Sequence, residues 1–219
     1  EDGTDGRDRR DRPALADRRD RPALADRRDL DAVYQPAEDS RLLAAAAVEA
    51  VDADDLVLEV GTGSGWVAER VASETGARVV GVDVNPEATR ETRERGIPVV
   101  QGDLVSPFRD GTFDVVCCNP PYLPTTPDQE WDDPMEAALS GGESGRAVVD
   151  PFLATVDRVL APGGFALLLV STLTDVDAVR EEAARADLAV TEVADESHPF
   201  ERLVVLRVER AGGRDAGGD

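Results

Sequence analysis

Short apolar runs that suit buried β-strands alternate with runs that suit α-helices along most of this 219-residue chain. A strand, a helix and a second strand normally form a right-handed parallel unit, so the alternation predicts a doubly wound α/β fold. We expect a mostly parallel, seven-stranded sheet that ends with an antiparallel strand. Strands are expected at 56–60, 78–82, about 99, 113–118, 165–170, 188–193 and 202–208. Helices are expected at 42–51, 67–73, from about 86, at 147–160 and at 176–186.

The N-terminal residues are built from a nine-residue repeat, in which Asp8–Ala16 recurs as Asp17–Ala25. The repeat has many charges and few apolar side chains, so burial cannot offset the entropy lost on folding. We therefore expect a disordered tail over residues 1–30, one domain over residues 31–210 and a flexible Gly-rich tail over residues 211–219. The alternative is that the repeat is an arm that binds a partner.

The formal net charge is −22, and all 24 basic residues are arginines. This acid excess repels polyanions at low salt, so direct nucleic-acid binding is not expected. It is similar to the excess in proteins of salt-accumulating, halophilic cells, where screening tolerates self-repulsion. The longest apolar run, Leu42–Val48, has seven residues, whereas a membrane span needs about 20. With no secretion signal in the sequence, a cytoplasmic location is expected.

Two adjacent cysteines, Cys117 and Cys118, fall within the expected strand 113–118. Successive side chains of a strand point to opposite faces, so these two thiols should be separated by the sheet. Neither a disulfide framework nor a metal site is therefore expected.

A glycine-rich turn, Gly61-Thr62-Gly63-Ser64-Gly65, follows the expected strand 56–60 and precedes a helix. Glycines permit positive φ and let a ligand approach the backbone closely. A dinucleotide-binding fingerprint places its third glycine one position later, where this chain has Trp66, and this argues against a nicotinamide dehydrogenase. Taken alone, the turn is equally compatible with an ordinary strand-to-helix connection.

Acidic residues follow the next two strands. Asp83 comes 18 residues after Gly65, where an acid accepts hydrogen bonds from ribose hydroxyls, and Asp103 follows the third strand. Parallel strands bring their carboxyl ends to one edge of the sheet, so both acids and the glycine-rich turn can surround one nucleoside. The alternative is that both are ordinary loop acids in an acidic chain.

The tetrapeptide Asn119-Pro120-Pro121-Tyr122 follows the expected strand 113–118. Its prolines remove two backbone donors and leave nearby carbonyls free to accept, while Asn119 offers a carboxamide and Tyr122 an aromatic face. These groups suit a planar ligand with an NH2 group, which can donate to the Asn119 side-chain oxygen and to the Pro120 carbonyl. A loop merely stiffened by proline is the alternative.

With these motifs, the chain resembles class I S-adenosylmethionine-dependent methyltransferases, and the tetrapeptide resembles the motif of those that act on amino groups. More narrowly, it resembles the archaeal and eukaryotic branch of the HemK family of release-factor glutamine methyltransferases. Residues 34–40 resemble that branch's Tyr-Glu-Pro-Ala-Glu-Asp-Ser/Thr motif, with Gln35 in place of the usual Glu. Residues 141–146 resemble its Gly-Gly-x-x-Gly-Arg loop. The N-terminal docking domain of the bacterial enzymes is not expected.

The resemblance implies an enzyme that uses S-adenosylmethionine to methylate the glutamine amide in the Gly-Gly-Gln loop of a class-1 release factor. It also implies a heterodimer with a small zinc-binding activator subunit, for which Val99–Val100 and Leu104–Val105 are the candidate apolar edge. An ordinary core strand is the stronger alternative for these residues. The implied catalytic residues are Asn119, Pro120 and Tyr122. The implied cofactor-binding residues are Tyr34, Pro36, Asp39, Ser40, Glu59, Gly61, Thr62, Gly63, Gly65, Asp83, Asp103, Leu104 and Asn119.

Two other functions remain open. The same tetrapeptide serves enzymes that methylate the exocyclic amine of a flipped adenine or guanine. A non-catalytic scaffold with the cofactor fold is the second, although such a subunit does not need Asn119 and Tyr122. No catalytic histidine is expected, because the single histidine, His198, lies in a polar connection where a surface position is expected.

Overall fold

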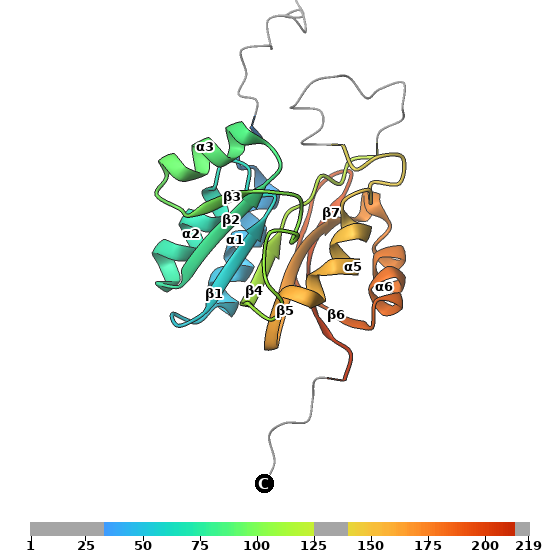
Figure 1. Ribbon diagram of the computed structural model, residues 1–219. Coiled ribbons are helices and arrows are strands. Elements are labelled where there is room, and N and C mark those ends of the chain that lie inside the picture. Colours follow the sequence, from blue (N-terminus) through green and yellow to red (C-terminus); the bar gives the residue numbers. More distant parts are fainter. Residues whose placement is uncertain (1–32, 125–139, 213–219) are drawn as a thin grey trace, which may run out of the picture. The chain divides into compact units, whose positions relative to one another are not determined.

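The computed structural model describes residues 33–124 and 140–212, which form a seven-stranded sheet of order β3-β2-β1-β4-β5-β7-β6 (Figure 1). The strands are β1 (Leu56–Val60), β2 (Arg78–Asp83), β3 (Val99–Gln101), β4 (Phe113–Cys118), β5 (Leu160–Ser171), β6 (Leu188–Ser197) and β7 (Arg202–Arg210). The helices are α1 (Glu38–Ala50), α2 (Trp66–Thr75), α3 (Pro86–Glu94), α5 (Val149–Val159) and α6 (Val176–Arg185). A short 3-10 helix, η3 (Thr172–Thr174), links β5 to α6.

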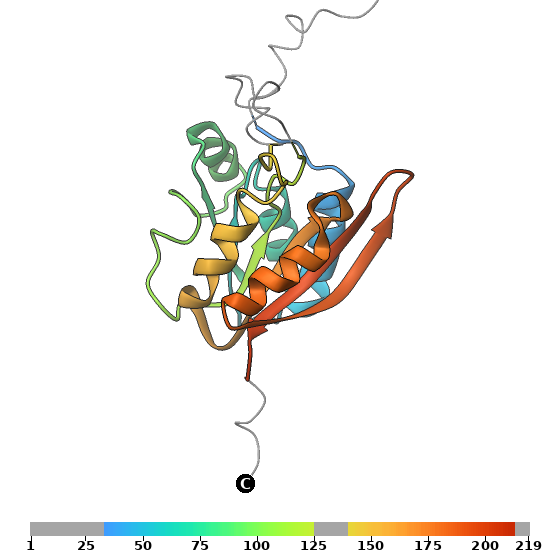
Figure 2. The same cartoon turned by 90° about the vertical axis from the view of Figure 1, so that its right-hand side faces the viewer.

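The predicted α/β fold is confirmed. Strands β1 to β5 pair in parallel, and β7 pairs antiparallel with both β5 and β6. The last strand is therefore inserted between two others and does not form the edge of the sheet. β6 and β7 form the long hairpin that runs along one side of the molecule in Figure 2.

β5 starts at Leu160, five residues before the expected position 165, and so takes the last residue of the expected helix 147–160. The early part of β5 still pairs with β4, through a register shift between Phe113 and Val115. Gly164 makes this possible, because a Cβ there would lie 2.9 Å from the carbonyl oxygens of Phe113 and Asp114. Apolar periodicity did not reveal this extension, since it contains Pro162, Gly163 and Gly164.

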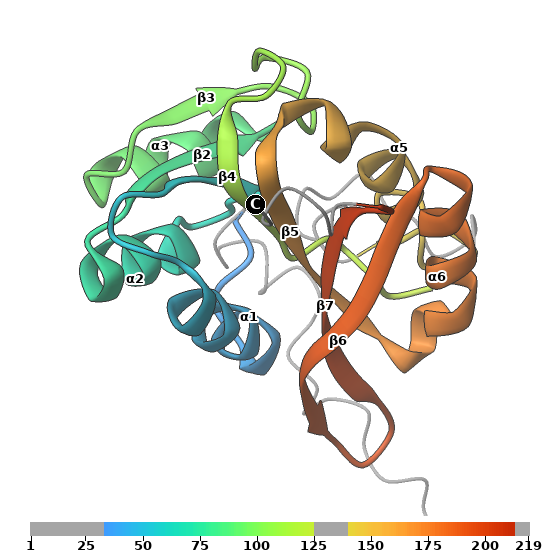
Figure 3. The same ribbon diagram turned by 90° about the horizontal axis from the view of Figure 1, so that it is seen from below.

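Helices cover both faces of the sheet, as Figure 3 shows, with α1 and α2 on one side and α5 and α6 on the other. Cys117 is buried in the cluster that contains α1 and α2, whereas Cys118 is buried in the cluster that contains α5 and α6. The adjacent thiols therefore point to opposite faces, as expected from strand alternation. Their burial raises the pKa of both thiols, so neither is a reactive thiolate.

The carboxyl ends of the parallel strands meet at one edge of the sheet. β1 lies between β2 and β4, and the connections from β1 and β4 leave on opposite faces, which makes this the switch point where α/β folds bind ligands. β3 is the outermost strand on one side of the sheet, so among the described strands it has only β2 as a neighbour. Its residue Val100 is 39% exposed. Val105, the other candidate for an exposed edge, is buried against the core, which agrees with the alternative of an ordinary core position.

Within residues 33–124 and 140–212, no helix is long and apolar enough to cross a membrane. The predicted tail at 1–30 and residues 213–219 of the predicted C-terminal tail lie outside the described residues.

Candidate active site

The glycine-rich turn leaves β1 and enters α2 in a conformation that its glycines permit. Gly61, Gly63 and Gly65 have φ of +68°, +52° and +78°, all in the left-handed region. The backbone amides of Gly61 and Thr62 donate to the Val82 carbonyl at 2.9 and 3.1 Å, which fixes the turn to β2. The turn therefore presents a preformed backbone surface at the switch point.

Gly65 is expected to tolerate no side chain, because a Cβ there would lie 2.8 Å from Thr92 Oγ1 and 2.9 Å from Thr92 Cα. Gly61 is a matched control, since it also has positive φ but nothing within 4 Å of a Cβ position. We expect Gly65→Ala to lower the unfolding free energy by about 3 kcal/mol and Gly61→Ala by about 1 kcal/mol. Urea unfolding followed by circular dichroism measures both losses. Equal losses would mean that α3 moves away without cost.

Glu59, the acid before the turn, is buried at the end of β1. Its Oε2 accepts hydrogen bonds from Thr62 Oγ1 at 2.5 Å and from the Ala68 amide at 3.0 Å. Burial raises the pKa of Glu59 to about 8, and these two hydrogen bonds oppose the rise only in part. Glu59 thus joins the turn to the first turn of α2 and holds a proton at neutral pH.

The raised pKa of Glu59 makes the stability pH-dependent. The folded protein keeps the proton up to pH about 8, while the unfolded chain loses it near the ordinary value of 4.5. The contribution of this group to the unfolding free energy therefore falls as pH rises from 4.5 to about 8. We expect Glu59→Gln to match the wild type near pH 5 and to melt at a higher temperature by pH 9. Identical pH profiles of the melting temperature would show that Glu59 is ionised throughout.

Asp83, at the end of β2, points its carboxylate back at the turn. Its Oδ2 accepts from the Gly63 amide at 2.9 Å, and its Oδ1 accepts from the Asn85 amide at 2.8 Å. Each oxygen keeps a second lone pair, so the carboxylate can still accept from a ligand. Burial raises the pKa of Asp83, although the backbone hydrogen bonds lower it. After β3, Asp103 and Leu104 line the same cavity as Asp83. Leu104 has a φ of +46°.

Tyr34 and Asp39 form a linked pair at the mouth of the site. Tyr34 Oη donates to Asp39 Oδ2 at 2.8 Å, and Asp39 Oδ1 accepts from the Ser40 amide at 2.6 Å. Burial, and next the Asp39 charge, raises the pKa of Tyr34 and Tyr122. Both phenols therefore remain protonated donors at neutral pH.

Asn119 lies directly after β4 and reaches across to this mouth. Its Nδ2 donates to Ser40 Oγ at 3.5 Å, a weak bond that still fixes which way the carboxamide faces. Its Oδ1 is buried and has no hydrogen-bond partner in the part of the chain that the structure describes. A buried carbonyl oxygen without a donor is costly and uncommon, and this oxygen is available to accept a hydrogen bond from a group that enters the site.

These elements enclose a cavity of about 330 Å³, within the size range of small-molecule sites. The sequence predicted a large part of its wall: Tyr34, Pro36, Ser40, Glu59, Gly61, Thr62, Gly63, Asp83, Asp103, Leu104, Asn119 and Pro120. Three predicted residues do not line it. Asp39 holds Tyr34, Gly65 packs on Thr92, and Tyr122 lies next to the cavity.

Other parts of the wall were not predicted. They include Val33, Trp66, Asn85 and Val148, which come from segments far apart in the sequence. The strand-end residues Val60, Val82 and Cys118 also line the cavity and could have been identified from the predicted strand boundaries. For Val33 and Val148 no local signal exists, because their positions depend on how the chain returns to the site.

A smaller cavity of about 80 Å³ adjoins Tyr122. Its wall includes Tyr34, Asp39, Tyr122, Glu201 and His198, so the β6–β7 hairpin reaches the mouth of the site. His198 departs from the expected surface position, since its side chain is only 26% exposed. Its Nε2 is buried without a hydrogen-bond partner among the described residues, 3.6 Å from Glu196 Oε1.

Comparison with known proteins agrees with this geometry. A family model described as a methyltransferase domain matches residues 57–141. A putative protein N5-glutamine methyltransferase of Methanocaldococcus jannaschii is 35% identical over 184 residues, covering 81% of this chain and 92% of the relative. Methyltransferase HEMK2 of Mus musculus is 34% identical over 194 residues, covering 82% of this chain and 90% of the relative. A chain in the structure of the E. cuniculi Mtq2–Trm112 complex, responsible for methylation of the eRF1 termination factor, is 28% identical, with a TM-score of 0.67 and coverage of 82% and 99%.

The identity to these relatives extends over most of both chains and is not confined to the glycine-rich turn. The overall fold is likewise similar to that of the structural neighbour. The chain therefore belongs to the HemK family of S-adenosylmethionine-dependent protein-glutamine methyltransferases.

Proposed function

We propose that this protein methylates the side-chain amide nitrogen of the glutamine in the Gly-Gly-Gln loop of a class-1 translation release factor. One observation carries this proposal: Asn119 lines the cavity, and its buried Oδ1 has no hydrogen-bond partner among the described residues. A primary amide supplies the N–H that this oxygen lacks. The proposal is supported by relatives named as glutamine methyltransferases and by a structural neighbour described as methylating eRF1.

The cavity fits S-adenosylmethionine at both of its polar ends. The Asp83 carboxylate has lone pairs available for ribose hydroxyls, and the Gly61–Gly63 backbone permits close approach of the methionyl part. We assign Asp103 and Leu104 to the adenine end, because they follow β3 next to Asp83. When bound, S-adenosylmethionine supplies an electrophilic methyl group on a sulfonium centre, which needs no further activation.

The work left to the protein is to position the acceptor. An amide nitrogen is a poor nucleophile because its lone pair is delocalised into the carbonyl. In the proposed complex, Asn119 Oδ1 and the Pro120 carbonyl accept the two N–H groups, and the ring of Tyr122 covers the amide plane. These acceptors orient the nitrogen toward the cofactor cavity and stabilise the positive charge that develops on it. The extra proton can leave afterwards, so no strong base is required.

We further propose that a small zinc-binding activator subunit pairs with this chain in a heterodimer. The structural neighbour is a complex of Mtq2 with Trm112, which supports a partner of this kind. β3 is the candidate docking strand, because within residues 33–124 and 140–212 one of its sides has no neighbouring strand, and Val100 is exposed. Release factors act on ribosomes, so the proposed reaction takes place in the cytoplasm.

The direct test is methyl transfer from labelled S-adenosylmethionine to a class-1 release factor, in molar salt, with and without the activator. Molar salt is chosen because the net charge of −22 is then screened over about 3 Å. DNA and RNA are tested in parallel as acceptors. Label on the release factor supports the proposal, whereas label only on nucleic acid would replace it with amino-group methylation of a base.

A further inference from the structure

The loop Gly141–Arg146 does not line the cavity, yet it contacts the residue that follows the tetrapeptide Asn119–Tyr122. The Gly141 amide donates to the Leu123 carbonyl at 2.8 Å, and Leu123 and Ser140 pair as an isolated parallel bridge. The Ala147 amide in turn donates to the Gly141 carbonyl at 2.9 Å. The backbone that follows Tyr122 is therefore tied to the segment that leads into α5.

Two glycines allow this close approach. Gly145 has a φ of +71°, and a Cβ there would lie 2.7 Å from the Tyr122 carbonyl oxygen and 3.0 Å from Thr174 Cγ2. A Cβ on Gly141 would lie 2.6 Å from the backbone of Gly145. Gly141, Gly145 and the Tyr122 backbone are thus stacked without room for a side chain.

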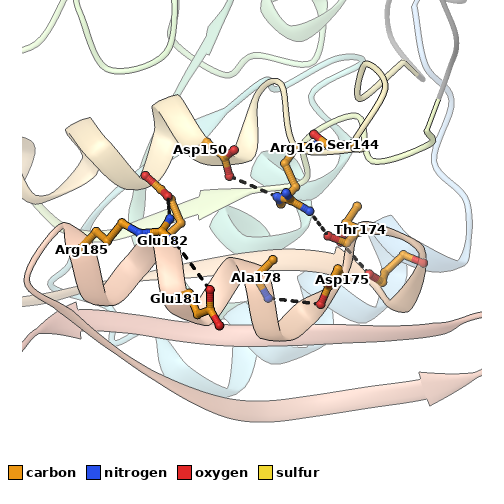
Figure 4. Close-up of polar contacts among 10 residues, drawn as sticks. Ser144, Arg146, Asp150, Thr174, Asp175, Ala178, Glu181, Glu182 and Arg185 are labelled. Atoms are coloured by element: carbon orange, nitrogen blue, oxygen red, sulfur yellow. Dashed lines mark hydrogen bonds and ion pairs between the residues drawn. The ribbon is translucent and has the colours of Figure 1, made fainter.

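Arg146 fixes the other side of this stack. Its Nη1 donates to the Thr174 carbonyl at 3.0 Å, and its Nε lies 3.6 Å from Asp150 Oδ1 (Figure 4). The Arg146 side chain is only 24% exposed, so these contacts are partly shielded from water. Thr174 is fully buried, and its hydroxyl donates to the Ser171 carbonyl at 2.6 Å, at the end of β5. The loop is therefore anchored to the central sheet.

We propose that Gly141, Gly145, Arg146 and Thr174 form a brace that holds the Tyr122 backbone in place and so aligns the acceptor amide. The inference rests on the proposed function, and it assigns these residues a positioning role, since none of them lines the cofactor cavity. Its physical basis is that a displacement of about 1 Å at a reacting group lowers the rate by about 100-fold. Because none of the four residues lines the cavity, the brace is proposed to act chiefly on the position of the amide that receives the methyl group.

Gly145→Ala tests the brace, with Gly142→Ala as a matched control. Gly142 has a φ of +68°, so it bears the same backbone strain, but its Cβ would meet only the Ala147 Cβ, at 3.1 Å. We expect Gly145→Ala to lower kcat for release-factor methylation by about 100-fold with an unchanged dissociation constant for S-adenosylmethionine. Gly142→Ala is expected to lose less stability, because it shares the backbone strain but not the close backbone contact, and to keep kcat. Equal kcat in the two variants would overturn the proposal.

Arg146→Ala, Arg146→Lys and Arg210→Ala provide a second series. Arg210 also donates to backbone carbonyls, but it does so near the start of β5. Its acceptors are the carbonyls of Asp157, Leu160 and Ala161. We expect Arg146→Ala to lower kcat about tenfold and Arg146→Lys to restore most of it, because an ammonium group can still donate to the Thr174 carbonyl. Arg210→Ala should lower the melting temperature without changing kcat. A loss of kcat that merely follows stability in all three variants would contradict the brace.

A measurement without substrate separates this inference from the proposed function. Hydrogen exchange over residues 140–148 reports on the Gly141 and Ala147 amides, and it should accelerate in Gly145→Ala but not in Gly142→Ala. Unchanged exchange in both variants would refute the brace whatever the acceptor is. Suppose that the wild type transfers no methyl group to a release factor, while exchange still accelerates in Gly145→Ala and not in Gly142→Ala. In that case the brace stands and the proposed methyl acceptor is wrong.

Discussion

Replacing Asn119 with alanine is expected to lower kcat for release-factor methylation by about 10³-fold, the largest effect of any single substitution considered. Asn119 Oδ1 is a buried hydrogen-bond acceptor that has no partner in the described residues. Its contribution to kcat is therefore expected only when the substrate amide is bound. Loss of one preorganised group that stabilises developing charge costs about 10² to 10³ in kcat. Single-turnover methyl transfer at saturating cofactor measures this loss.

Asn119→Asp is the informative companion. It keeps an oxygen acceptor at the same place but loses the Nδ2 donor that bonds to Ser40 Oγ. We expect it to retain more activity than Asn119→Ala. Both variants should melt within a few degrees of the wild type, because the amide group makes only this one weak hydrogen bond among the described residues. If Asn119→Ala keeps kcat within about threefold of the wild type, the acceptor site has been misplaced.

Replacing Asp83 with asparagine is expected to weaken S-adenosylmethionine binding by about 10- to 100-fold. Hydrogen bonds to a charged group contribute about 1.5–3 kcal/mol, and the substitution removes the charge that we propose accepts from the ribose. It also places an NH2 group where an oxygen now accepts from either the Gly63 or the Asn85 amide. Isothermal titration of the cofactor measures the dissociation constant.

Asp114→Asn is the control for this substitution. Asp114 Oδ2 accepts from the Leu56 amide at 2.8 Å. Its carboxylate therefore also holds a neighbouring segment, but at the amino ends of β1 and β4, away from the cavity. It should lower stability and leave the dissociation constant of the cofactor unchanged. Similar losses of affinity in Asp83→Asn and Asp114→Asn would mean that Asp83 acts through the fold and not by contact with the ribose.

The cofactor side of the site was largely predictable from the sequence because its signals are local. The bounds of β1 and β4 agree with the expected strands 56–60 and 113–118, and the acids at strand ends fall where the sheet brings them together. Positive φ at Gly61, Gly63 and Gly65 was likewise expected from their position between a strand and a helix. In these segments, period, turn chemistry and topology all point to the same structure.

The acceptor side was less predictable because it depends on contacts between distant segments. The bond from Asn119 to Ser40 joins residues 79 positions apart, and the hairpin residues His198 and Glu201 reach the mouth only because β7 inserts between β5 and β6. Gly145 gave no sign that its partner is the Tyr122 carbonyl. Such contacts are set by tertiary packing, for which a single sequence has no periodic signal.

The most direct measurement is methyl transfer to two forms of the same release factor, the wild type and a variant with the Gly-Gly-Gln glutamine replaced by glutamate. Glutamate has nearly the same shape but no amide N–H, so it cannot donate to Asn119 Oδ1. We predict one methyl group on the glutamine, located by peptide mass, and none on the variant. Undiminished labelling of the variant would contradict it, because the acceptor would then be a group other than that amide.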